Sequence, residues 1–231
     1  MKAAILVESR KPLVIADIDL PTKLEFGQVL VKICYSGVCG SQINEIDAAK
    51  ESDKFLPHLL GHEGSGIVEK IGEGVTTVKV NDHVVLHWRK SSGVESVTPR
   101  YFWNGKKLNA GRITTFNEKA IVSENRLTVI PPNIHQNLAA LMGCAVTTAL
   151  GTLANDAKIR LGDSIVIFGC GGVGLSLIQF AKVSGCFPII GIDIYENKLK
   201  HAVSVGATHT INAGNKDYIK QILKANSGLK I

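Results

Sequence analysis

A glycine-rich loop in the last third of the chain constrains the fold more than any other feature. The apolar run Ile165–Phe168 leads into Gly169-Cys170-Gly171-Gly172-Val173-Gly174, and a segment of helical character follows. In such a G-x-G-x-x-G loop, Gly169 permits the tight turn, Gly171 lets a pyrophosphate approach the backbone, and Gly174 lets the helix pack on the strand. The helix N-terminus then offers free N–H groups to the phosphates. The loop predicts a parallel α/β sheet that binds a dinucleotide.

An acidic residue, Asp193, ends the next predicted strand. It follows Gly174 by 193 − 174 = 19 residues, close to the offset at which a carboxylate reaches the adenosine ribose hydroxyls. The same charge repels a 2′-phosphate, so the sequence favours NAD over NADP. The alternative for Asp193 is a solvated residue at a strand end. Gly172 and Val173 open the helix and complete the predicted cofactor contacts.

The pattern of the chain changes at about residue 136. A helix is predicted over 137–153, after which strands and helices alternate, which favours a parallel sheet with right-handed crossovers. The predicted segments are strands 164–168, 187–193 and 208–212 and helices 172–184, 196–205 and 216–225. Three strands make half of a doubly wound domain, and residues 229–231 lie where a fourth strand would begin. We therefore expect the chain to be part of a longer protein.

Residues 1 to about 130 have a different character. Short runs rich in Val, Ile and Leu are separated by Gly, Pro, Asn and Asp, which is typical of an irregular β-barrel or sandwich. The predicted strands are 1–8, 13–18, 29–35, 66–71, 82–86 and 120–122. We place the domain boundary after residue 145, giving domains 1–145 and 146–231.

Three separated residues, Cys39, His62 and Cys144, form a candidate zinc site. Catalytic zinc usually keeps three protein ligands and one open position, and two thiolates balance its charge while leaving it Lewis acidic. Taken singly, each cysteine is more often a small buried side chain, and a histidine is more often a polar group with an ordinary partner. The combination of all three predicts a metal centre.

The sequence around each of these residues resembles the zinc-dependent medium-chain alcohol dehydrogenase family. The run Gly61–Val75, closed by Asp82 and Val84, is similar to the family's zinc signature, and Gly37–Ser41 and Gly143–Thr148 are similar to the segments that carry its other two ligands. The resemblance implies an α/β protein with a GroES-like, β-rich catalytic domain followed by the first half of a Rossmann domain. It also implies hydride transfer between an alcohol or polyol and NAD.

The resemblance implies further residue roles. Glu63 would act as an occasional fourth zinc ligand, and Ser41 would relay the substrate proton; its alternative is a turn serine bonded to its own backbone. The remaining residues would contact substrate or cofactor, with plain packing or a surface position as the alternative: Trp88 in the substrate pocket, Thr148 on the nicotinamide and Lys198 near the ribose.

Two positions near Ser41 depart from the family pattern. Asn44 stands where the proton relay often continues through a histidine, and Gln42 stands where an aspartate usually steadies the zinc-binding histidine. Both put simple ethanol-type activity in doubt. Many family members also hold a structural zinc on four cysteines, but residues 87–115 contain no cysteine. We expect one catalytic zinc per chain and no structural zinc.

Composition limits the partners. The net charge is +6 over 231 residues, but the basic residues are scattered, so a nucleic-acid partner is not expected, and a mild positive field suits an anionic cofactor. No apolar run is long enough to span a bilayer. Five cysteines without close spacing, and no export signal, favour a cytoplasmic protein with reduced thiols. The resemblance implies a homo-oligomer for the full-length protein.

Two other functions stay open at this point. One is a sugar or biosynthetic-intermediate dehydrogenase with a bulky polar substrate, whose pocket residues 87–115 would shape. The other is a non-catalytic dinucleotide-binding relative or an inactive fragment. The intact set of zinc ligands argues against the non-catalytic relative, whereas the expected absence of a C-terminal part keeps an inactive fragment open.

Overall fold

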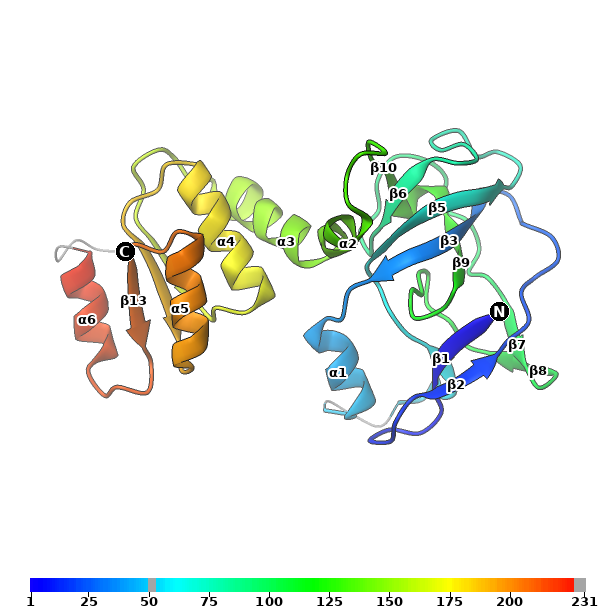
Figure 1. Cartoon of the computed structure of the whole chain (residues 1–231), viewed down its shortest axis with the longest axis horizontal. Helices are drawn as coiled ribbons and strands as arrows, with labels where there is room; N and C mark the ends of the chain where they lie inside the picture. Colours follow the sequence, from blue (N-terminus) through cyan, green and yellow to red (C-terminus); the bar gives the residue numbers. More distant parts are fainter. Residues whose placement is uncertain (50–52, 227–231) are drawn as a thin grey trace. The chain divides into compact units, whose positions relative to one another are not determined.

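The computed structural model describes residues 1–49 and 53–226. The chain divides into two compact units, Met1–Cys144 and Ala145–Ile231, where the sequence placed the boundary after residue 145. Each unit is described below by itself (Figure 1). The expected fourth strand at 229–231 lies outside the described residues.

The first unit is built on a five-stranded antiparallel sheet in the order β10-β6-β5-β3-β9. Its strands are β3 (Gln28–Ser36), β5 (Gly64–Ile71), β6 (His83–Leu86), β9 (Lys119–Ser123) and β10 (Leu127–Val129), with a 3-10 turn η1 (Glu124–Arg126) before β10. Alternating side chains of β3, such as Val29 and Val31, are fully buried in one apolar cluster with Val68, Val84 and Val122. The runs rich in Val, Ile and Leu that predicted strands from the sequence therefore build this core with alternate side chains.

A second, smaller sheet completes the β-rich unit. It has the order β2-β1-β4 and contains β1 (Lys2–Leu6), β2 (Val14–Asp17) and β4 (His58–Leu59). The hairpin β7 (Tyr101–Trp103) and β8 (Lys106–Leu108) packs on it through the fully buried Tyr101. Asn104 and Gly105 join the two hairpin strands with φ of 51° and 72°, as a tight hairpin turn requires.

Two helical features of the first unit differ from the sequence prediction. A short helix α1 (Gly40–Ile46) interrupts a region that was expected to be β-rich. The single helix expected over 137–153 is wrong, because the chain forms α2 (Gln136–Ala140) and η2 (Leu141–Gly143) and then leaves helical geometry at Cys144, with φ −139° and ψ −80°. Both features position proposed zinc ligands.

The second unit is a parallel sheet in the order β11-β12-β13, as predicted. It starts with α3 (Ala145–Gly151) and the π-helical η3 (Thr152–Ala157), and continues with β11 (Ile165–Phe168), α4 (Gly172–Val183), β12 (Ile189–Asp193), α5 (Glu196–Val205), β13 (His209–Asn212) and α6 (Tyr218–Ala225). Apart from the region 137–153, the predicted strands and helices of the chain are confirmed to within two residues at each end.

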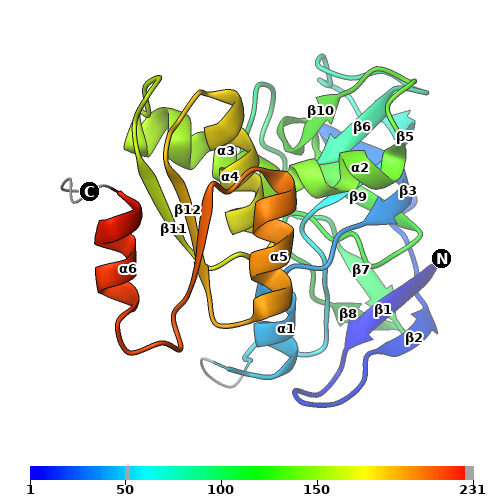
Figure 2. The same ribbon diagram turned by 60° about the vertical axis from the view of Figure 1, so that its left-hand side comes forward.

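Both faces of this sheet are covered, which explains the mostly apolar sequences of β11 and β12. Ile189 packs with residues of α4 and α5 on one face, and Ile190 and Ile192 pack with Ile222 of α6 on the other (Figure 2). Gly191 lies under the helices α4 and α5, where an added Cβ would come within 3.4 Å of Ala202 and Ile178. The glycine thus lets the helices approach the strand closely.

Among the described residues no single helix is long and apolar enough to cross a membrane. The pair of segments 136–143 and 145–157 passes the same length and composition test only when counted together, a test that core helices also pass.

Candidate active site

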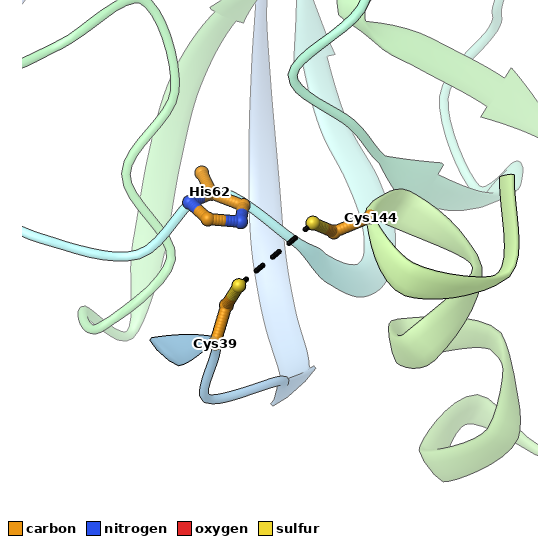
Figure 3. Close-up of side chains that lie close together, drawn as sticks. All are labelled: Cys39, His62 and Cys144. Carbon is orange, nitrogen blue, oxygen red and sulfur yellow. Dashed lines mark hydrogen bonds between the residues drawn. The ribbon is translucent and has the colours of Figure 1, made fainter. Parts of the chain in front are cut away.

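The three predicted zinc ligands meet in the first unit (Figure 3). Cys39 is the N-cap residue of α1, His62 lies between β4 and β5, and Cys144 follows η2. Their ligand atoms all lie within 4.8 Å of one another, and the two Sγ atoms are 4.0 Å apart. Residues that are far apart in sequence therefore form one N/S donor set.

This donor set fits a zinc ion. With Zn–S bonds of about 2.3 Å, two sulfurs at a tetrahedral centre lie about 3.8 Å apart, close to the observed separation of 4.0 Å. The Nε2 atom of His62 is buried and has no hydrogen-bond partner among the described residues. A buried nitrogen of this kind costs free energy unless something binds it, and a metal ion would supply that partner.

The protonation of the site follows from its burial. Burial, with further contributions from the negative charges of Cys39 and Glu63, raises the pKa of the Cys144 thiol to about 12. Burial also lowers the pKa of His62, so the imidazole is neutral near pH 7. A divalent cation reverses the first effect, because a coordinating thiol loses its proton.

Gln42 lies directly against the candidate ligands. Its Oε1 accepts a hydrogen bond from the backbone N–H of Cys39 at 3.1 Å, and its amide nitrogen is in very short contact with Nδ1 of His62. Ser41 lies beside it, with Oγ 3.5 Å from the same Nδ1. The side chain predicted to replace the family's aspartate therefore does contact the imidazole.

Glu63, which the sequence indicated only as an occasional zinc ligand, also packs closely against two glycines, and the sequence did not predict this packing. Glu63 is 3% exposed. A Cβ on Gly37 would lie 2.6 Å from its carboxyl group, and a Cβ on Gly143 would lie 2.9 Å from its Cβ and 2.3 Å from the carbonyl of Leu86. The two glycines precede Cys39 and Cys144 closely in sequence, and that proximity was the available signal. Only glycine lets both ligand-bearing segments pack this closely on Glu63.

The glycine loop of the second unit has the geometry that its sequence predicts. Gly169 adopts φ +90°, and a Cβ on Gly174 would lie 1.8 Å from the carbonyl oxygen of Gly169, whereas one on Gly171 would meet no atom within 4 Å. Gly172 and Val173 are the first residues of α4. The loop thus leaves open backbone at the second glycine, where a pyrophosphate would approach.

Asp193 lies at the end of β12 next to this loop. Its Oδ2 accepts the N–H of Cys170 at 2.8 Å, and its Oδ1 accepts the N–H of Tyr195 at 3.0 Å. Burial opposes ionisation, but these hydrogen bonds and the nearby Lys198 outweigh it and hold the carboxyl pKa below its usual range. Lys198 Nζ is 3.9 Å from the carboxylate. The side chain is therefore an anion at neutral pH.

Trp88, Thr148 and Asn44, which the sequence relates to the substrate, the cofactor and the proton relay, lie on the surface of their own units. Trp88 follows β6 and is 52% exposed. Thr148 lies on α3, and Asn44 lies on α1, both exposed. The predicted roles of Trp88 and Thr148 in the substrate and nicotinamide sites stay predictions.

The cysteine-free segment 87–115 is held by buried and half-buried charges. Glu95 forms ion pairs with Lys90, Arg112 and Arg126, and the guanidinium of Arg126 is almost fully buried. Oε1 of the fully buried Glu124 accepts the N–H of Val94 at 2.7 Å. These contacts fix the segment in a region where many family members are expected to use a structural zinc.

Known proteins are similar in sequence to this chain over nearly its whole length. The alcohol dehydrogenase GroES-like domain family matches residues 25–132, and the zinc-binding dehydrogenase family matches residues 172–231. An S-(hydroxymethyl)glutathione dehydrogenase of Synechocystis sp. is 34% identical, with 98% of this chain aligned to 68% of that protein.

Solved structures agree. An alcohol dehydrogenase zinc-binding domain protein from Burkholderia ambifaria superposes with a TM-score of 0.88 at 27% identity, and benzyl alcohol dehydrogenase from Acinetobacter calcoaceticus with 0.85 at 29%. Each comparison covers 96% of this chain and 66% of the other, so the chain spans about two thirds of the length of these relatives. The GroES-like and dinucleotide-binding parts expected from the sequence are thereby confirmed, and the chain belongs to the zinc-dependent medium-chain alcohol dehydrogenase family of oxidoreductases.

Proposed function

We propose that this chain holds one zinc ion on Cys39, His62 and Cys144 and binds NAD at the glycine loop 169–174, in an enzyme that transfers hydride between an alcohol or polyol and NAD. The observation that carries this proposal is the meeting of two thiols with a buried imidazole nitrogen that has no hydrogen-bond partner among the described residues. The relatives named above support the reaction class, and the donor set supports the metal.

The bound groups supply the redox chemistry: zinc contributes Lewis acidity towards an alcohol or carbonyl oxygen, and NAD accepts or returns the hydride. The chain's own residues bind these groups and move the proton. We propose that Ser41 accepts the substrate proton, because its exposed hydroxyl lies beside the metal ligands. Asn44 cannot titrate, so the proton leaves Ser41 to water rather than to a histidine. We propose Glu63 as an occasional fourth ligand of the zinc ion.

NAD is the proposed dinucleotide because Asp193 is ionised. Its carboxylate oxygens retain lone pairs for ribose hydroxyls after accepting two backbone N–H groups, and its charge disfavours a 2′-phosphate. Lys198, close to that carboxylate, is proposed to lie near the same ribose.

A single zinc is proposed because residues 87–115 contain no cysteine and the ion pairs of Glu95 already hold that segment. A homo-oligomeric full-length protein, a cytoplasmic location and the lack of a nucleic-acid partner stay predictions from the sequence.

Metal analysis tests the central claim. Protein purified without an affinity tag should contain about one zinc per chain, and Cys144→Ser should lose most of it, because the remaining two ligands bind zinc far more weakly. Cys34→Ser is the matched control, since Cys34 lies on β3 and outside the cluster, and it should keep the metal. A folded, metal-free wild type, or equal zinc in both variants, contradicts the proposal.

A further inference from the structure

A second group of metal-ligating side chains lies in the first unit and shares no residue with the zinc site. Glu45 on α1, Asp53, and His58 on β4 offer one ligand atom each, all within 4.8 Å of one another. One imidazole with two carboxylates is an N/O donor set, which suits divalent first-row cations harder than those that thiolates select.

The histidine is already arranged as a metal ligand would be. His58 is 7% exposed, and its Nδ1 lies 2.9 Å from the carbonyl oxygen of Leu59. A carbonyl can only accept, so Nδ1 carries a proton, and Nε2 is the nitrogen that faces the carboxylates, where a bound cation would take the place of the proton shared with Asp53. A backbone carbonyl that fixes the tautomer in this way is the usual support of a metal-binding histidine.

The carboxylates are also oriented towards this nitrogen. Asp53 turns Oδ2 to within 2.6 Å of Nε2 of His58, while its Oδ1 accepts the N–H of Phe55 at 2.7 Å. A protonated His58 and Asp53 alone would make a neutral ion pair. The carboxylate of Glu45, whose ligand atom lies within 4.8 Å of theirs, adds a second negative charge that this ion pair does not balance.

We propose that Glu45, Asp53 and His58 form a second cation site, which takes a divalent first-row metal of the Mn²⁺ type through two carboxylate oxygens and Nε2 of His58. Because Glu45 is exposed, the remaining coordination positions are open to water, and the ion exchanges with solvent more readily than zinc at the thiolates. The ion would tie α1, which carries Ser41 and Gln42, to β4.

The test uses the whole chain loaded with one equivalent of zinc, titrated with Mn²⁺ and followed by electron paramagnetic resonance. We expect about one bound Mn²⁺ per chain with the hyperfine signature of one coordinated imidazole nitrogen. Glu45→Gln should weaken binding about tenfold or more, equivalent to about 1.4 kcal/mol, because it removes a charged ligand. This variant leaves the His58–Asp53 contact intact, so folding is preserved.

Two controls separate this site from the proposed zinc site. Asp47→Asn removes an exposed carboxylate just after α1 that lies outside the cluster, and Cys39→Ser disables the thiolate site; both should bind Mn²⁺ as the wild type does. His58→Gln should abolish the nitrogen signature. No specific Mn²⁺ binding, or binding that Glu45→Gln leaves unchanged, overturns the proposal, and loss of Mn²⁺ in Cys39→Ser assigns the ion to the other site.

Discussion

At the scale of single residues, the proposed chemistry depends on side chains that touch the imidazole of His62. Ser41 and Gln42 both reach its Nδ1, while Nε2 has no hydrogen-bond partner within the described part of the chain. One ring nitrogen is thus held by α1, and the other is left for a metal. Substitutions on α1 should therefore separate proton transfer from metal binding.

Ser41→Ala should lower kcat at least about tenfold, the usual contribution of a positioned proton-transfer group being larger still, and should leave the zinc content unchanged. Ser41→Thr keeps a hydroxyl at the same place and should restore most of the rate. Steady-state kinetics together with metal analysis of the three proteins provide the check. Unchanged turnover in Ser41→Ala would show that the serine is only a surface residue of the first helical turn.

At the scale of secondary structure, Gln42 links the start of α1 to the metal ligands. It occupies the third position of the helix and accepts the N–H of the N-cap residue Cys39, which is half of a capping box. Because Cys39 is itself a proposed ligand, the contact that begins the helix also orients the thiol.

Gln42→Glu should strengthen zinc retention. Both carboxylate oxygens would accept, one from Cys39 and one from the Nδ1–H of His62, and a negative charge at a helix N-terminus is favourable. Gln42→Ala should weaken retention about tenfold or more, as is typical for the outer partner of a metal-binding histidine. Competition with a chelator measures both, and the order Glu, Gln, Ala is the expected one; identical retention in all three would contradict it.

The same elements show what the sequence predicted and what it did not. Most strands of the chain and the helices α4, α5 and α6 were predictable, because their apolar residues recur with the period of the element. Helix α1 was missed because its seven residues, Gly40–Ile46, contain only two apolar side chains, Ile43 and Ile46, too few for a periodic signal.

The break at Cys144 was missed for a different reason. The composition around it, rich in Ala and Leu, favours an uninterrupted helix, while the contacts of Gly143 with Leu86 and Glu63 come from distant sequence. The meeting of Cys39, His62 and Cys144, in contrast, was predicted, but only from the resemblance to the dehydrogenase family. Their spacing in the sequence does not by itself bring residues 39 and 144 together.

At the scale of the whole first unit, the buried carboxylate of Glu124 forms hydrogen bonds to two separate loops, one at residues 76–77 and one at residue 94. Oε2 of Glu124 accepts the N–H groups of Thr76 and Thr77 and the hydroxyl of Thr77, and Oε1 accepts the N–H of Val94. Burial by itself would raise the pKa of Glu124, but these hydrogen bonds outweigh it, and the pKa lies below its usual range. The folded state therefore prefers the ionised form.

This preference fixes the sign of a pH effect. A carboxyl group whose pKa is depressed by folding contributes stability above its unfolded pKa of about 4.3, and that contribution disappears as the pH falls through the folded value. Glu124→Gln should therefore destabilise the unit by about 2–3 kcal/mol near neutral pH, because its NH₂ group would face a backbone N–H that needs an acceptor. The difference from the wild type should shrink as the pH falls below about 4.

Urea unfolding followed by tryptophan fluorescence provides the measurement, since both tryptophans, Trp88 and Trp103, belong to the first unit. Glu8→Gln, at an exposed position in the same unit, is the control and should unfold like the wild type at each pH. If the difference in unfolding free energy between Glu124→Gln and the wild type is the same at every pH, the negative charge of Glu124 does not contribute to stability. The hydrogen bonds to Thr76, Thr77 and Val94 would then not explain how residues 87–115, which contain no cysteine, are held in place.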